Sequence, residues 1–308
     1  IDVINNWRIV IEEAEKWEND SSLTLKAQQF QMVLSDTDMY AKVRGAEYNR
    51  LFESNPTGLS YVYYKKILKS YYTDNPRINS IMSKYHSDMV LLRKLLNGSS
   101  ELLLAVFVLL LIDTTANVES IRKLKLSNFQ NDGEAPEIVW FKGRDNRFHR
   151  KILDRKNVND RQLIVAIEVL KKSLEFVRTQ SNNKDNDNLF IQRYKNNITK
   201  YATDKGASTP AGATFCRWFT EECLKVSKGS WSASLKAIRG SLLLLTAMVT
   251  KDSFIVKEQG GWVGNSSMSE KYTRHFAEIQ RRDNNIRDFL SWYETLTTIN
   301  IENFPEKI

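Results

Sequence analysis

Two basic residues in the C-terminal third have the spacing of an anion site. Lys236 and Arg239 are three residues apart and would share one face of a helix. Both stand at the start of an otherwise apolar segment, residues 242–249, and a helix N-terminus favours an anion. The sequence therefore indicates either a phosphate contact here or a solvated first turn.

A tryptophan and then a tyrosine follow this pair along the chain. Trp262 comes 23 residues after Arg239, and Tyr272 comes ten residues after Trp262, in a basic and polar setting. A tyrosine in such a setting can attack phosphorus and form a phosphotyrosyl intermediate that keeps the bond energy of a cut strand. The other interpretation is a half-buried tyrosine with a structural role.

Taken in order, these segments resemble the catalytic motifs of the tyrosine recombinase/integrase family. Lys236–Arg239 is similar to the family's His-or-Lys-x-x-Arg pair, and Gly261-Trp262 to its Gly-His/Trp element. The segment Ser266–His275 resembles the one that carries the nucleophile, and Lys142 stands where the family has a hairpin lysine. The resemblance covers about Met89 to Trp292.

The resemblance implies a metal-free transfer of a DNA strand to Tyr272 without a cofactor. Arg239 and Lys236 would bind the non-bridging oxygens, and Trp262 would pack against the phosphate or donate its indole N–H to it. Lys142 would protonate the leaving 5′ oxygen. No acidic cluster has metal-ligand spacing, which argues against a two-metal nuclease.

One position departs from the family. The stretch that matches the first catalytic arginine is Thr114–Leu124, and in its register the arginine is replaced by Asn117. Arg122 lies five residues further on and is a poor substitute. Because phosphoryl transfer depends on charge stabilisation, a missing arginine can cost about 10³–10⁵ in rate. Another cation fills the gap, or the enzyme is slow, or cleavage has been lost.

A β-hairpin is the one convincing strand signal. Residues 137–141 and 148–153 flank a turn-rich segment, and Lys142 ends the first strand. Arg144, Arg147 and Arg150, with Lys151, form either an edge that contacts the DNA backbone or a solvated turn; beside Lys142 we favour the DNA contact.

A basic, tyrosine-rich helix is predicted over residues 59–72. Lys65, Lys66 and Lys69 could neutralise phosphates, and the tyrosines among them could pack on sugars. The resemblance implies that this block is the core-binding domain, which clamps DNA from the other side. The alternative is an amphipathic helix with a solvated lysine face.

Composition bounds the remaining interpretations. The 308 residues suggest two domains, and the net charge of +8 favours a polyanionic partner. Two Cys exclude a disulfide scaffold, and three His leave little for a metal site. The longest apolar run, Leu102 to Ile112, has eleven residues against about 20 for a bilayer span, so we predict a buried core helix and no membrane partner.

We therefore predict a mainly α protein with a small β-sheet (α+β). Residues 1–80 form the helical core DNA-binding (clamp) domain, and residues 81–308 form the recombinase catalytic domain with a C-terminal assembly segment. Further helices are predicted over residues 3–19, 21–34, 36–52, 89–96, 118–125, 160–178, 214–226, 235–249, 253–259 and 270–293. Because the chain opens with Ile1-Asp2, we expect it to be part of a longer protein.

The resemblance implies a site-specific recombinase/integrase or transposase of a mobile element. Its partners would be double-stranded DNA and further copies of the chain, as dimers and tetramers on DNA. An apolar stripe follows Tyr272; it either packs on its own domain or, as the resemblance implies, docks on a neighbouring protomer. If the protein is prokaryotic or viral, it would act in the cytoplasm with the nucleoid. If it is eukaryotic, it would act in the nucleus. The alternatives are an inactive DNA-binding protein on the same fold, a type IB topoisomerase, and a basic helical scaffold.

Overall fold

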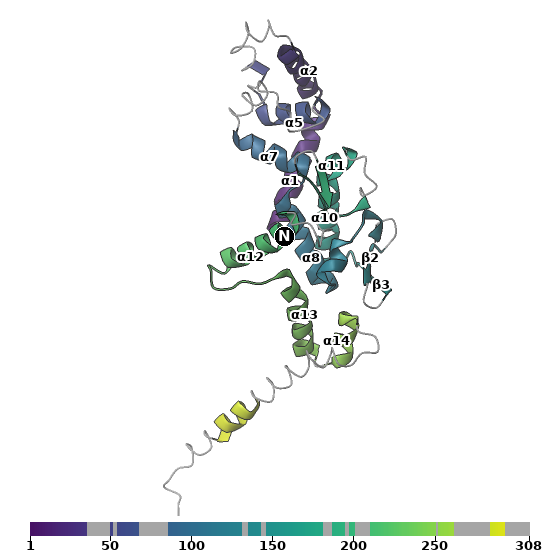
Figure 1. The fold of residues 1–308 in the computed structure, drawn as a ribbon, viewed down its shortest axis with the longest axis vertical. Coiled ribbons are helices and arrows are strands. Elements are labelled where there is room, and N and C mark those ends of the chain that lie inside the picture. Colours follow the sequence, from purple (N-terminus) through teal and green to yellow (C-terminus); the bar gives the residue numbers. More distant parts are fainter. Residues whose placement is uncertain are drawn as a thin grey trace, which may run out of the picture. The chain divides into compact units, whose positions relative to one another are not determined.

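The computed structural model describes most of the chain in two compact units. The described residues are 1–35, 50–51, 54–67, 86–130, 135–142, 146–180, 187–194, 197–200, 210–250, 252–261 and 284–292. The units are Ile1–Leu235 and Lys236–Ile308, and each is described by itself. The described part is mainly helical with a small antiparallel sheet, as predicted (Figure 1).

Three helices open the first unit. α1 (Asp2–Asn19) buries one stripe with helical spacing, and α2 (Ser21–Ser35) follows after Asp20. Asp20 caps α2, because its carboxylate accepts hydrogen bonds from the backbone N–H groups of Ser22 at 2.8 Å and Leu23 at 3.3 Å. α5 (Pro56–Ile67) contacts both helices. The predicted helix over 36–52 lies almost entirely outside the described residues.

α5 begins earlier than the sequence predicted. Asn55 accepts a hydrogen bond from the Gly58 backbone N–H at 2.8 Å, and Pro56 occupies the first helical position. Residues 55–58, which precede the predicted start at residue 59, therefore form the helix start, since proline is favoured at the first helical position and asparagine before it.

The buried helix of the sequence is the centre of the first unit. α7 (His86–Asn97) leads to α8 (Ser100–Thr114), which Ser99 caps by accepting from the Leu102 N–H. Seven of the eleven apolar side chains in residues 102–112 are buried, although Ile112 is 46% exposed, and this confirms the predicted core helix. Thr115 has a left-handed backbone conformation (φ 51°) and ends α8. After this turn, α9 (Val118–Arg122) begins at Val118.

α1 connects the beginning of the chain to elements far along the sequence. It packs on α8 and on α10 (Val158–Ser173) as well as on α5. Lys172 of α10 bonds Glu15 of α1 at 2.8 Å. Residues of both predicted domains therefore share one compact unit, and the predicted boundary at residues 80 and 81 lies outside the described residues.

The sheet contains three antiparallel strands. They are β1 (Phe129–Gln130), β2 (Glu137–Lys142) and β3 (Arg147–Ile152), in that order, so β3 is an edge strand. A short 3₁₀ turn, Leu126–Asn128, precedes β1. β2 and β3 confirm the predicted hairpin; β1 was not predicted, because a two-residue strand has no periodicity to detect.

Three further differences from the prediction follow β3. The helix predicted over 160–178 is divided at Leu174 into α10 and α11 (Glu175–Thr179). A second hairpin, β4 (Ile191–Tyr194) with β5 (Asn197–Lys200), was not predicted. α12 (Pro210–Val226) begins four residues before its predicted start.

The second unit contains α13 (Leu235–Thr250) and α14 (Ser253–Gly260), close to their predicted bounds. Leu243 and Ala247 of α13 pack with Val256 of α14, and all three are buried. Residues 284–292 form a helical segment inside the longer helix predicted over 270–293.

The membrane expectation concerns α7 and α8. Among the described residues no single helix is both long and apolar enough to cross a bilayer. The segments Val90–Asn97 and Ser100–Thr114, bent by 50°, satisfy that test together by length and composition.

Candidate functional site

The hairpin places Lys142 at the end of β2 that adjoins the turn. Ile138, Trp140 and Lys142 alternate along one face of the strand, and all three are buried. Lys142 retains only 5% of its exposure and lies opposite Arg147 in the ladder. Lysine is rarely so deeply buried without an ion pair or a functional role.

The hairpin arginines have different surroundings from Lys142. Arg147 and Arg150 are exposed on the edge strand β3, and Phe148 between them is 71% exposed. Neither arginine forms an ion pair with a described residue. Arg144 lies outside the described residues. β3 can therefore approach an external anion along its edge.

Asn117 begins the short helix α9. Its backbone carbonyl accepts from Ser120 N–H at 3.0 Å and Ile121 N–H at 3.2 Å, and its side chain makes no capping bond. α9 contacts β2, the strand that carries Lys142. Arg122 ends α9 and lies 3.7 Å from Glu119, so this cation has an acidic neighbour.

In the second unit, one contact joins two of the sequence motifs. Arg239 lies one turn into α13, and its Nη2 donates a hydrogen bond to the Gly260 carbonyl at 2.7 Å. Gly261 then ends α14 with φ 58°, a left-handed conformation that suits glycine. Arg239 thus holds the turn that leads directly to Trp262. Lys236, in the first turn of α13, is exposed.

Three other predicted site residues lie outside the described residues: Trp262, Tyr272 and Lys69. The geometry of the predicted nucleophile is therefore not described. Since Lys142 and Arg239 belong to different units, each is placed only within its own unit.

The predicted DNA-binding helix α5 has internal partners. Tyr61, Tyr63 and Tyr64 are buried, so these tyrosines form core rather than a surface for sugars. Glu18 of α1 accepts a hydrogen bond from the Tyr61 hydroxyl at 2.6 Å and forms an ion pair with Lys65. Burial, followed by the bond to Glu18, raises the pKa of Tyr61 well above its usual value. Lys66 is exposed and donates to Thr24 Oγ1 at 3.2 Å.

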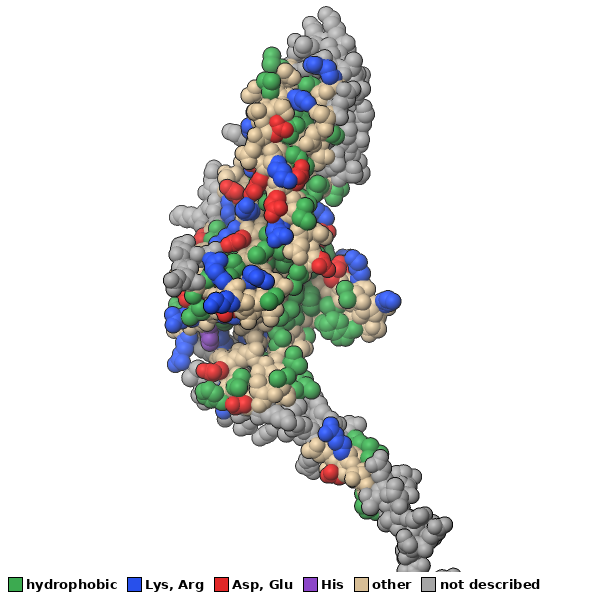
Figure 2. Space-filling model, turned by 180° about the vertical axis from the view of Figure 1, so that it is seen from behind, with side chains coloured by type: hydrophobic (Ala, Val, Ile, Leu, Met, Phe, Trp, Pro, Cys, Tyr) green, Lys and Arg blue, Asp and Glu red, His purple; other side chains and the backbone are tan. Residues whose placement is uncertain are grey.

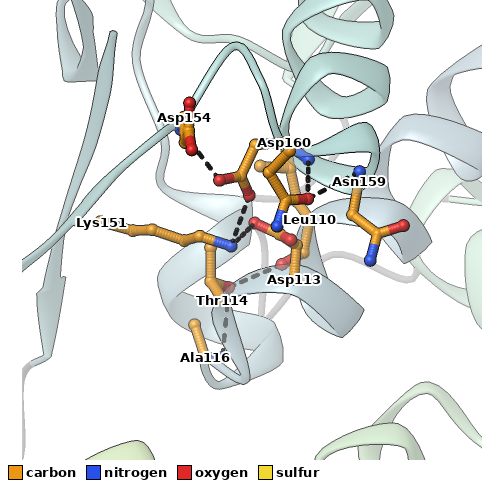
Figure 3. Close-up of polar contacts among 9 residues, drawn as sticks. Leu110, Asp113, Thr114, Ala116, Lys151, Asp154, Asn159 and Asp160 are labelled. Carbon is orange, nitrogen blue, oxygen red and sulfur yellow. Dashed lines mark hydrogen bonds and ion pairs between the residues drawn. The ribbon is translucent and has the colours of Figure 1, made fainter. Parts of the chain in front are cut away.

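A charged cluster that joins β3, α8 and α10 was not predicted (Figure 3). Lys151 of β3 reaches Asp113 Oδ2 in the last turn of α8 at 2.6 Å and Asp160 Oδ1 in the first turn of α10 at 3.0 Å. We call these three residues the Lys151 cluster. Although burial works to lower the pKa of Lys151, the bonds to the two aspartates raise it above its usual value.

Strand alternation was the one signal for this cluster in the sequence. Lys151 stands two residues from His149 and so shares a face with it, whereas Arg150 points to the opposite face. Its partners could not be found this way, because Asp113 is 38 residues away along the chain.

Basic and acidic side chains are intermixed on the face drawn in Figure 2. Among the described residues, no group of three His, Cys, Asp or Glu side chains could hold a metal ion. The candidate site residues that the structure describes are lysines, arginines and an asparagine. Their N–H groups can donate hydrogen bonds to phosphate oxygens.

Comparisons with known proteins find similarity in backbone structure only. No protein-family model and no curated protein matches the chain. The solved structures that align include the XerH site-specific recombinase bound to a palindromic difH substrate in a post-cleavage complex, at 16% identity and TM-score 0.38. That alignment covers 63% of this chain and 53% of the XerH chain, so the chain spans about half of that relative.

Two further aligned structures are recombinases. The pre-cleavage complex of XerH with difH has 14% identity and TM-score 0.37, covering 74% of this chain and 72% of the other. The XerA recombinase has 13% identity and TM-score 0.35, covering 91% of each chain.

Proposed function

We propose that this chain is a DNA strand-exchange enzyme of the tyrosine recombinase type. The observation that carries the proposal is the bond from Arg239 to the Gly260 carbonyl. It ties the Lys-x-x-Arg motif to the Gly-Trp motif in space, although 21 residues separate the two bonded positions. A chance match of two short motifs would not require such contact.

The proposed reaction needs only side chains of this chain and DNA. The Tyr272 hydroxyl oxygen forms a bond to the scissile phosphorus while the bond from phosphorus to the 5′ oxygen breaks, and the phenolic proton passes to water. The Lys142 ammonium gives a proton to the departing 5′ oxygen and regains one from the 5′ hydroxyl that attacks in the second step. A 5′ hydroxyl of a second strand then reverses the step.

Burial of Lys142 supports its role as the proton donor. A nearly buried ammonium is shielded from bulk water, and its proton can be aimed at one atom. Arg239 and Lys236 would stabilise the charge on the non-bridging oxygens, which is the main contribution that a protein makes to phosphoryl transfer.

The test is covalent capture of DNA. Nicked duplexes that tile the DNA flanking the gene are incubated with the protein, and a denaturing gel separates protein–DNA adducts. We expect an adduct with the wild-type protein and none with Tyr272→Phe, which removes only the phenolic oxygen. Tyr63→Phe, a substitution in the α5 core, serves as the matched control and should retain the adduct. An undiminished adduct with Tyr272→Phe would contradict the assignment.

A second candidate is a DNA-binding protein that no longer cleaves. Asn117 favours it, because an uncharged side chain stands where the resemblance implies an arginine, and the nearby Arg122 lies beside Glu119. This candidate expects DNA binding without an adduct. Asn117→Arg should then restore adduct formation, or raise its rate if the wild type is merely slow.

We also propose that residues 284–292 dock on a second copy of the chain on DNA. Ile286, Phe289, Leu290 and Trp292 are all exposed on this helical segment, and such a stripe is favourable only when covered. Phe289→Ser with Leu290→Ser should spare binding of one protomer to DNA but weaken dimers and tetramers in gel shifts. Full assemblies with this variant would contradict the proposed docking.

A further inference from the structure

We infer that Lys151 is a positioning residue that sets where Lys142 delivers its proton, an inference that rests on the proposed function. Lys151 lies on the same strand as the exposed Arg147 and Arg150, but it is only partly exposed. Its ammonium instead joins the end of α8 to the start of α10, through Asp113 and Asp160 (Figure 3).

Further hydrogen bonds and burial hold the two aspartates of the Lys151 cluster in place. Asp160 uses its second oxygen to accept from the Asp154 backbone N–H at 2.9 Å, and its own N–H lies 3.3 Å from the Asn157 side chain. The side chains of Asp113 and Asp160 retain only 12% and 10% of their exposure. Because an uncompensated buried carboxylate is costly, the ammonium holds all three segments together.

The Lys151 cluster lies at the base of the hairpin. Lys151 is paired with Ile138 in the ladder, and the Leu153 N–H donates to the Pro136 carbonyl at 2.7 Å beside it. A two-stranded hairpin is only marginally stable alone, so its direction depends on such anchors. Among the described residues, the strand that pairs with the other side of β2 is the two-residue β1.

Lys142 lies at the turn end of the hairpin, whose base the Lys151 cluster holds in place. Lys142 is four positions along β2 from Ile138, a rise of about 14 Å, so that a rotation of the hairpin by about 5° at its base moves Lys142 by about 1 Å. A misplacement of that size can cost about 100-fold in rate. The same cluster holds the end of α8, from which the chain turns to Asn117 and α9.

A sulfur substitution in the DNA tests this role. When the 5′ bridging oxygen is replaced by sulfur, the leaving group departs as a thiolate, since a thiol has a pKa of about 8.5 and needs no proton from Lys142. A defect in proton delivery is therefore repaired by the sulfur substrate, and a general loss of folding or of DNA binding is not.

The variant combines Asp113→Asn, Lys151→Met and Asp160→Asn, which removes all three charges and leaves no buried ion uncompensated. Single-turnover cleavage is measured on the duplex that forms the adduct, with oxygen or sulfur at the bridging position. We expect a loss of about 10–100-fold on oxygen, near wild-type cleavage on sulfur and unchanged DNA affinity. Lys172→Gln, which removes the exposed bond to Glu15, is the control and should cleave both substrates normally.

The outcomes separate the two proposals. If the wild type forms no adduct on either substrate, the proposed function fails and the inference with it. If the wild type cleaves and the triple variant is equally slow on both substrates, or is not slow at all, the inference alone is overturned. Should circular dichroism show that the triple variant does not fold, Lys151→Arg, which keeps the charge but moves the bonding atoms, is compared on the same two substrates.

Discussion

Replacing Arg147 and Arg150 with glutamine removes two exposed positive charges from β3 while the side chains keep much of their length. Both residues lie on an edge strand, and neither has an ion-pair partner among the described residues. If β3 contacts the DNA backbone, each arginine neutralises a phosphate and releases its counterions. The affinity of the wild type should therefore depend on salt more steeply than that of the variant.

The expected magnitude follows from counting contacts. Each lost phosphate contact reduces the slope of log K against log salt by about 0.9, so two lost contacts reduce it by about 1.8. Between about 50 and 200 mM salt, this difference changes the ratio of the two affinities by about 12-fold. The wild type should thus have its largest advantage at low salt.

Fluorescence anisotropy with a labelled duplex of about 30 base pairs measures the two slopes, a length well above one helical turn. The control replaces Arg8 and Arg217 with glutamine, which also removes two charges, but from residues that lie within 4 Å of Glu12 and Glu221 on their own helices. Its slope should match the wild type. Equal slopes for all three proteins would show that β3 is a solvated edge.

Two further predictions concern the stability of the first unit. Tyr61→Phe removes the 2.6 Å bond to Glu18 and should lower the free energy of unfolding by about 1–2 kcal/mol in urea titrations; no loss would mean that water replaces the hydroxyl. The bonds from the Ser22 side chain and backbone, and then from Leu23, hold the pKa of Asp20 below 3.8, so its stabilisation of α2 is present above pH 3.8 and is lost as the pH falls through the lowered pKa. The Ser22 amide resonance should report this titration by NMR, and Asp20→Asn should abolish it.

The sequence predicts elements whose signals are local. α8 was predicted from its continuous apolar run, and the β2–β3 hairpin was predicted from two strand-like segments that flank a turn-rich segment. α5 was placed too late, since a proline can end a pattern or begin a helix, and Pro56 stands at the first helical position. β4 and β5 were missed because polar residues alternate in a short segment whose stability comes from pairing.

Contacts between residues far apart in the sequence determine the burial of the α5 tyrosines and the partners of Lys151, which the sequence alone did not predict. The tyrosines of α5 were taken as a surface for sugars, but residues 59–64 are all buried, and no pattern within one helix distinguishes core from interface. Lys151 was grouped with the hairpin arginines because all are basic. Its partners come from α8 and α10, and only the fold brings them to the same face of the sheet.

The position of α1 has a consequence for how the chain folds as it leaves the ribosome. Glu15 and its partner Lys172 are 157 residues apart, and at about 5–20 residues per second α10 emerges about 8–30 s after α1. During that interval the stripe that includes Trp7, Ile11 and Trp17 has no α10 to cover it. We expect nascent chains stalled before residue 158 to bind hydrophobic-segment chaperones, and chains stalled well after α10 has emerged to release them.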